Sequence, residues 1–139
     1  MKKEEQLFWK FGKDLSKGTV LFREGDLGRE MFIIQKGRVQ VRKRVGTAEK
    51  VLAELSDGEF FGEMALLTGM DRSATVEVIE DSKLLVINPD TFESLLKSNP
   101  DIALKMLKKM ASRLRALDEH FESAILEATK EDKENKQVS

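Results

Sequence analysis

A glycine, a carboxylate and an arginine stand close together near the middle of the chain, at Gly62, Glu63 and Arg72. Glycine lets the backbone approach a ligand, and the first N–H groups of a short helix starting there lack partners and favour an anion. An arginine guanidinium matches phosphate oxygens with two parallel donors. An anion repels a carboxylate, so Glu63 fits such a site only if the same ligand offers it a hydroxyl. The three residues therefore predict a site for a molecule with one anionic end and one free hydroxyl, such as a cyclic ribose phosphate.

The stretch around these residues resembles the phosphate-binding cassette of the cyclic nucleotide-binding domain family. The resemblance rests on Phe61-Gly62-Glu63-x-Ala65-Leu66-Leu67 and on Arg72-Ser73-Ala74-Thr75. It extends from about Lys17 to about Asp118 and includes segments 18–26 and 37–39. In that family the glutamate binds the ribose 2′-hydroxyl, the arginine pairs with the cyclic phosphate, and backbone N–H groups of a short helix complete the site. The resemblance implies a ligand-binding set within the cassette: Gly62, Glu63, Met64, Ala65, Arg72, Ser73 and Ala74.

The same resemblance implies where the base of the nucleotide lies, between a β-roll and a long helix. Val41 and Leu52 are expected to pack against the face of the base, while Arg113, Leu117 and Asp118 approach its edge. In bacterial cAMP-responsive activators small hydroxyl residues meet the adenine, and the matching positions here are Leu117 and Asp118. The Asp118 carboxylate can accept from the adenine amino group or from the N1 and N2 donors of guanine. The expected ligand is cAMP, with cGMP or a pyrimidine cyclic nucleotide left open.

Arg72 alone has a plainer interpretation, as a solvated arginine at the end of a strand. It would then pair with Asp71 or Glu63, and such surface pairs contribute little to stability. The cassette spacing of Gly62, Glu63, Arg72 and Ser73 favours ligand binding instead.

Length and composition predict a single regulatory domain. A chain of 139 residues can bury one core, and its net charge of −1 is spread without a basic face, which argues against nucleic-acid binding. The absence of cysteine excludes disulfides and thiolate metal sites, and the single histidine, His120, cannot assemble a metal centre. No stretch approaches the length of a membrane span, so no membrane is expected as a partner and the cytoplasm is the expected compartment.

The first part of the chain is predicted to combine a helix with a β jelly roll. Residues 1–16 are expected to form a short amphipathic helix, and residues 17–89 a jelly roll that the cassette at 61–75 interrupts. Eight of the nine glycines lie between Gly18 and Gly69 and punctuate the expected strands. Lys36-Gly37 is expected to form a tight turn. The predicted strands are Thr19–Arg23, Met31–Gln35, Arg38–Arg44, Lys50–Leu55, Ala74–Ile79 and Lys83–Asn88.

Residues 90–129 have a helical pattern. A short helix is expected at Asp90–Lys97, followed by a long helix from Pro100 to about Ala128. Apolar residues recur along the long helix at spacings of four and three, which favours pairing with a second copy of the chain. The alternative is that this seam covers the open side of the roll. Residues 130–139 have little apolar content and are expected to be disordered. The seam consists of Ala103, Leu107, Met110, Leu114, Leu117, Phe121, Ala124 and Ala128.

The leading functional hypothesis is a non-catalytic nucleotide-binding module that acts through a dimer interface or an unknown effector protein. No helix-turn-helix domain is expected after the long helix, so the output is expected in another polypeptide or in self-association. A scaffold domain that binds no nucleotide is the first alternative. A jelly-roll enzyme such as a phosphodiesterase is disfavoured, because the sequence shows neither a metal cluster nor a nucleophile–base pair.

Overall fold

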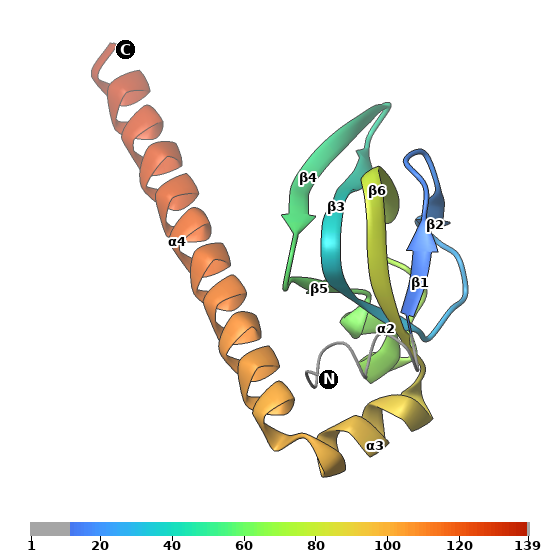
Figure 1. The fold of residues 1–139 in the computed structure, drawn as a ribbon. Coiled ribbons are helices and arrows are strands. Elements are labelled where there is room, and N and C mark those ends of the chain that lie inside the picture. Colours follow the sequence, from blue (N-terminus) through green and yellow to red (C-terminus); the bar gives the residue numbers. More distant parts are fainter. Residues whose placement is uncertain (1–11, 139) are drawn as a thin grey trace. The chain divides into compact units, whose positions relative to one another are not determined.

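The chain divides into two compact units, with the boundary between Glu93 and Ser94. An antiparallel sheet makes up most of the first unit. The structure, a computed structural model, describes the backbone of residues 12–138 and the side chains of residues 12–130. β6 is central to the sheet, since it pairs with β1, β2 and β3, while β3 also pairs with β4 and β5 (Figure 1). The predicted β jelly roll with flanking helices is confirmed. The strands are β1 (Gly12–Leu15), β2 (Val20–Phe22), β3 (Met31–Val45), β4 (Ala48–Ser56), β5 (Phe60–Phe61) and β6 (Thr75–Ile87).

The core of this unit lies on the inner faces of β3 and β6. Apolar and polar side chains alternate in the middle of each strand, whereas Met31–Ile34 and Leu84–Ile87 are apolar runs in which adjacent residues are buried. Phe32 and Phe61 stack with their ring centroids 5.0 Å apart, and the ring of Phe22 lies 6.0 Å from the first and 6.1 Å from the second. These three rings form an apolar surface beside the cassette, where Arg72 lies over the ring of Phe22. The largest fully buried side chains are those of Met31, Ile34, Val39, Val76, Val78, Leu84 and Ile87.

Two predicted breaks in the sheet are wrong. Lys36-Gly37 is not a turn, because β3 runs through it from Met31 to Val45, and β6 likewise joins the two strands predicted on either side of Glu80. The pairing of β3 with β6 shifts register on both sides of Lys36 instead. Such irregularities bend a strand without ending it. The Gly37 N–H donates to Asp57 Oδ1 at 2.9 Å, and the neighbouring Arg38 N–H donates to Ser82 Oγ at 3.1 Å.

The helix predicted for residues 1–16 is wrong for residues 12–16, none of which is helical. Gly12–Leu15 is strand β1, which pairs antiparallel with Ser82–Leu85 of β6. Residues 12–15 are extended because they pair with the edge of β6. Such pairing readily overrides the helical preference of a short segment. Residues 1–11 of the predicted helix lie outside the described residues.

Three helices complete the described chain: α2 (Glu63–Thr68), α3 (Pro89–Ser98) and α4 (Pro100–Val138). α3 matches the predicted short helix to within one residue at each end, and Pro100 begins α4 as expected. The predicted disordered segment from residue 130 is wrong for the backbone as far as Val138, where α4 ends. Lysine and glutamate are strong helix formers, and extending an existing helix is easier than starting one. Within residues 12–138, no helix combines the length and apolar character needed to cross a membrane.

Gly37 should be the glycine whose replacement most strongly destabilises the sheet. Its φ is +120°, and an added Cβ would lie 2.0 Å from Ser82 Oγ and 2.7 Å from Ser82 Cα. We expect Gly37→Ala to lower the free energy of unfolding by about 2–5 kcal/mol, since overpacking and backbone strain each cost about 1–3 kcal/mol. Urea denaturation measures this change.

Gly46→Ala is the matched control, because Gly46 also has a positive φ, +64°, but no atom lies within 4 Å of the added Cβ. It should cost only the left-handed strain, about 1–2 kcal/mol. Equal losses in the two variants would contradict the steric explanation.

Candidate functional site

The helix of the cassette begins at a glycine in a left-handed conformation. Gly62 has φ 82° and ψ 2° and caps α2 without any side-chain hydrogen bond, and Glu63 follows as the first helical residue. Glu63 is half-buried, Met64 is exposed and Ala65 is buried. A positive φ costs glycine nothing, so Gly62 turns the chain sharply from β5 into α2. The N–H groups of the first turn then lie at the start of the helix, where a carboxylate or phosphate is favoured.

The Arg72 side chain is almost completely buried, at 3% exposure. Its guanidinium donates from Nη1 to the Gly62 carbonyl at 3.3 Å and lies 4.1 Å from the centroid of the Phe22 ring. Nη2 lies 3.5 Å from Glu30 Oε2, whose side chain is half-exposed. The structure thus brings Arg72 to Gly62, the residue that caps α2, while Glu30 and Phe22 are contacts that the sequence did not reveal.

The loop between β2 and β3 holds Arg72 in this position. The Arg72 N–H donates to the Asp26 carbonyl at 2.9 Å, and the Gly25 N–H donates to the Arg72 carbonyl at 2.8 Å. A Cβ at Gly28 would lie 3.0 Å from Arg72 Nη2, and a Cβ at Gly62 would lie 3.0 Å from Nη1. Two glycines on different loops therefore make room for one guanidinium. Sequence reasoning missed Gly28, because nothing in the neighbouring residues points to Arg72.

The contacts of the Arg72 guanidinium do not fully offset the cost of removing its charge and donors from water. Burial lowers the pKa of Arg72 from its ordinary value, and the Glu30 and Asp26 carboxylates oppose that shift. Arg72 Nε is buried and has no hydrogen-bond partner among the described residues. A buried donor without an acceptor is costly, and a phosphate oxygen would satisfy it with a charge-assisted bond.

The remaining predicted ligand residues are distributed over both units. Ser73 is exposed and Ala74 is buried, directly before β6. Val41 is half-buried against the core of the sheet, whereas Leu52 on β4 is 54% exposed and falls at the irregularity where the pairing of β3 with β4 shifts. The residues expected at the base edge, Arg113, Leu117 and Asp118, lie on α4 in the second unit.

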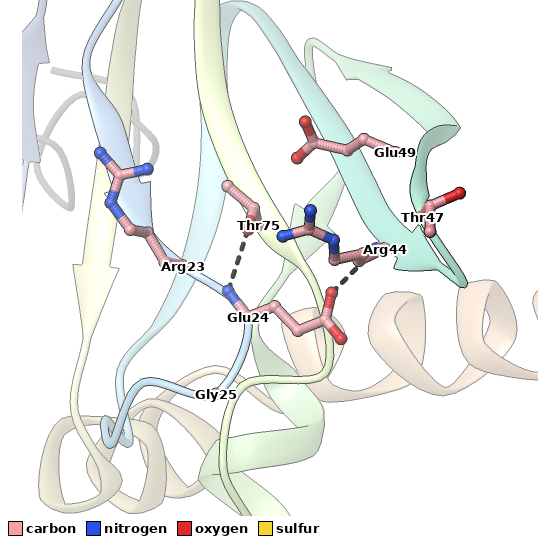
Figure 2. A pocket seen from close by; sticks show the side chains of 7 residues that line it. All are labelled: Arg23, Glu24, Gly25, Arg44, Thr47, Glu49 and Thr75. Atoms are coloured by element: carbon pink, nitrogen blue, oxygen red, sulfur yellow. Dashed lines mark hydrogen bonds between the residues drawn. The ribbon is translucent and has the colours of Figure 1, made fainter.

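A polar cavity of about 660 Å³ lies beside the cassette rather than within it. It shares only Thr75 with the predicted cassette and includes neither Glu63 nor Arg72 (Figure 2). Within the described residues, no group of three histidine, cysteine, aspartate or glutamate side chains is placed to hold a metal ion.

The sequence profile of the cyclic nucleotide-binding domain family matches residues 13–99, which include the cassette and all of the sheet except Gly12. The chain belongs to this family. It is 36% identical over 103 residues to the cyclic AMP receptor protein of Thermus thermophilus, an alignment that covers 73% of this chain and 48% of the receptor. This cyclic nucleotide-binding domain therefore spans about half the length of that relative.

Solved structures agree with this family membership. The crystal structure of the Thermus thermophilus catabolite activator protein superposes with a TM-score of 0.75 at 30% identity, covering 88% of this chain and 59% of that one. EAL enzyme Bd1971 is similar in its cAMP-bound form, with a TM-score of 0.57, and in its cGMP-bound form, with 0.58. In both forms it is 33% identical and the match covers 75% of this chain and 28% of that one.

Replacing Arg72 by methionine should leave the ligand-free protein nearly as stable as before. The guanidinium is desolvated, its Nε is unpaired, and its ion-pair partner Glu30 can turn to solvent. Exchanging such a buried charge for an apolar side chain of similar length is often neutral, and methionine keeps a contact with the Phe22 ring, so we expect a change within about 1 kcal/mol.

Urea denaturation of Arg72→Met without ligand tests this expectation. Glu30→Gln serves as a control that keeps the guanidinium and removes the opposing charge. A loss well above 2 kcal/mol in Arg72→Met would mean that the arginine holds the cassette together even without a ligand.

Proposed function

We propose that this domain binds cAMP in the cassette and passes the binding signal to a second protein chain. The observation that carries the proposal is the Arg72 guanidinium, which is buried, contacts the Gly62 carbonyl and keeps Nε without a partner among the described residues. Such a guanidinium has a free donor that can bind an oxyanion at the start of α2. Membership of the cyclic nucleotide-binding domain family supports the same ligand class.

In this proposal two ionised side chains of the cassette bind different parts of the ligand. Arg72 pairs with the cyclic phosphate, and the first N–H groups of α2, at Glu63, Met64 and Ala65, donate to the phosphate oxygens. Ser73 and Ala74 border the phosphate, with the Ser73 hydroxyl as a further donor. The Glu63 carboxylate accepts from the ribose 2′-hydroxyl, which explains why an acid stands beside an anion site.

The choice of cAMP rests on the relative named cyclic AMP receptor protein. Bd1971 has been solved with cAMP and with cGMP, so the fold itself accommodates either base. We assign the face of the base to Val41 and Leu52, whose side chains are incompletely buried. Its edge is assigned to Arg113, Leu117 and Asp118 of α4.

We further propose that α4 pairs with a second copy of the chain. Leu107, Leu114, Leu117 and Phe121 repeat at heptad spacing along α4, and each is more than half exposed in the single chain. Apolar residues on such a seam are stabilised when a second helix covers them. Ligand binding would then act on the pairing of the two copies, or on an effector protein, by favouring the conformation with the higher affinity.

Two substitutions test the proposed roles of Arg72 at the phosphate and of Glu63 at the ribose hydroxyl. Arg72→Ala should weaken cAMP binding by about 3 kcal/mol or more, because the anion loses its buried partner. Glu63→Ala should cost less, about 1–3 kcal/mol, and should reduce discrimination against 2′-deoxy-cAMP. Titration calorimetry with cAMP, cGMP, cCMP and 5′-AMP measures both effects and the base preference.

Lys97→Ala is a control for these titrations, since it removes a charge from exposed α3, outside the cassette. Unchanged affinity in both cassette variants would defeat the site assignment. The appearance of 5′-AMP after incubation with cAMP would instead indicate an enzyme.

A charge on the seam should dissociate the dimer. Leu114→Glu places a carboxylate in the centre of the proposed interface, and sedimentation equilibrium should show at least about a tenfold weaker dimer, which corresponds to about 1.4 kcal/mol. Ser112→Glu is the matched control, because Ser112 is exposed on the same helix and lies off the seam. Identical association of the wild type and Leu114→Glu would contradict the seam.

A further inference from the structure

The polar cavity beside the cassette is built from three separate parts of the sheet unit. One wall comes from the end of β2 and the loop after it, another from the β3–β4 hairpin, and Thr75 at the start of β6 lies between them (Figure 2). Its volume of about 660 Å³ is in the range of small-molecule sites. The lining residues are Arg23, Glu24, Gly25, Arg44, Thr47, Glu49 and Thr75.

Hydrogen bonds join these walls. The Glu24 N–H donates to Thr75 Oγ1 at 2.9 Å, and the Arg44 N–H donates to Glu24 Oε1 at 3.0 Å, as the dashed lines in Figure 2 show. Glu24 therefore links the loop after β2 to both β6 and the hairpin. A site fixed by such bonds needs little reorganisation when a ligand enters.

The charged groups of the cavity differ in how far the protein already engages them. Glu24 accepts from the Arg44 backbone, and Glu49 Oε1 forms an ion pair with Arg42 Nε at 2.9 Å. The Arg23 and Arg44 guanidiniums, by contrast, have neither a hydrogen bond nor an ion pair with any side chain in the described part of the chain. Both guanidiniums with unused donors thus belong to the cavity lining, where that of Arg44 points toward Thr75 while that of Arg23 points away from Arg44 (Figure 2).

We propose that this cavity is a second binding site, separate from the cassette, for a small phosphate monoester that also carries hydroxyl groups. Arg44 holds the phosphate, because guanidinium donors match its oxygens, and Arg23 at the edge of the cavity adds positive charge. The carboxylates of Glu24 and Glu49 and the hydroxyls of Thr47 and Thr75 hold the hydroxyl groups, since carboxylates accept and hydroxyls both donate and accept. The carboxylates would repel a bare phosphate, so the hydroxyl groups are part of the recognition.

Ribose 5-phosphate is the probe for this site. We expect its addition to the wild-type domain to shift the backbone NMR signals of residues 23–25 and 44–49, with much smaller shifts for residues 62–65 in the cassette. Ribose and inorganic phosphate, tested separately, should each bind at least about tenfold more weakly, because each satisfies only half of the polar groups.

Arg44→Gln should weaken ribose 5-phosphate binding at least about tenfold while leaving cAMP affinity unchanged within about twofold. Lys50→Gln is the matched control, since it removes the same charge from the same hairpin at an exposed residue outside the cavity lining, and it should keep the wild-type affinity within about twofold. Arg23→Gln provides a second test if Arg44→Gln fails to fold.

Three outcomes would overturn the proposal: no shifts at residues 23–25 and 44–49, equal weakening by Arg44→Gln and Lys50→Gln, or shifts confined to the cassette. Loss of cAMP binding in Arg72→Ala concerns the cassette alone, so the two sites can fail independently.

Discussion

The burial of one arginine side chain is the constraint on which the described site depends. Arg72 can remain charged beneath the surface only because a carbonyl, a phenylalanine ring and a half-exposed carboxylate surround its guanidinium. Each of these partners comes from a different segment, so the guanidinium contacts the end of β2, the loop before β3 and the glycine that precedes α2. Its compensation is incomplete, since Nε lacks an acceptor among the described residues. The folded chain thus carries the cost of a buried donor without an acceptor, as binding sites often do.

Glycine has a spatial role around this arginine as well as a conformational one. Gly62 supplies the left-handed turn into α2, and together with Gly28 it leaves the space that the guanidinium fills. The loop after β2 serves two neighbouring regions: its backbone binds that of Arg72 through Gly25 and Asp26, and Glu24 closes the wall of the polar cavity. A change in this loop therefore reaches both regions through direct hydrogen bonds.

The parts of the fold that depend on neighbouring residues were predictable from the sequence. The spacing of Gly62, Glu63 and Arg72 located the cassette, and Pro100 marked the start of α4 to the residue. What could not be predicted depends on residues far apart in the chain. Gly37 was expected in a turn because Ser82, which decides its role, stands 45 positions later, and the four residues of β1 were expected to be helical because the edge of β6 cannot be seen locally. Glu30 and Gly28 were missed for the same reason, since only the folded chain brings them to Arg72.

The contact between Gly37 and Ser82 also selects one alignment of the two longest strands. An added Cβ at position 37 would overlap Ser82, so a side chain there is strongly disfavoured. If β3 slipped by one residue along β6, Lys36 or Arg38 would take that place and meet the same overlap. The close approach at Gly37 therefore favours the observed alignment of β3 with β6 over its one-residue neighbours.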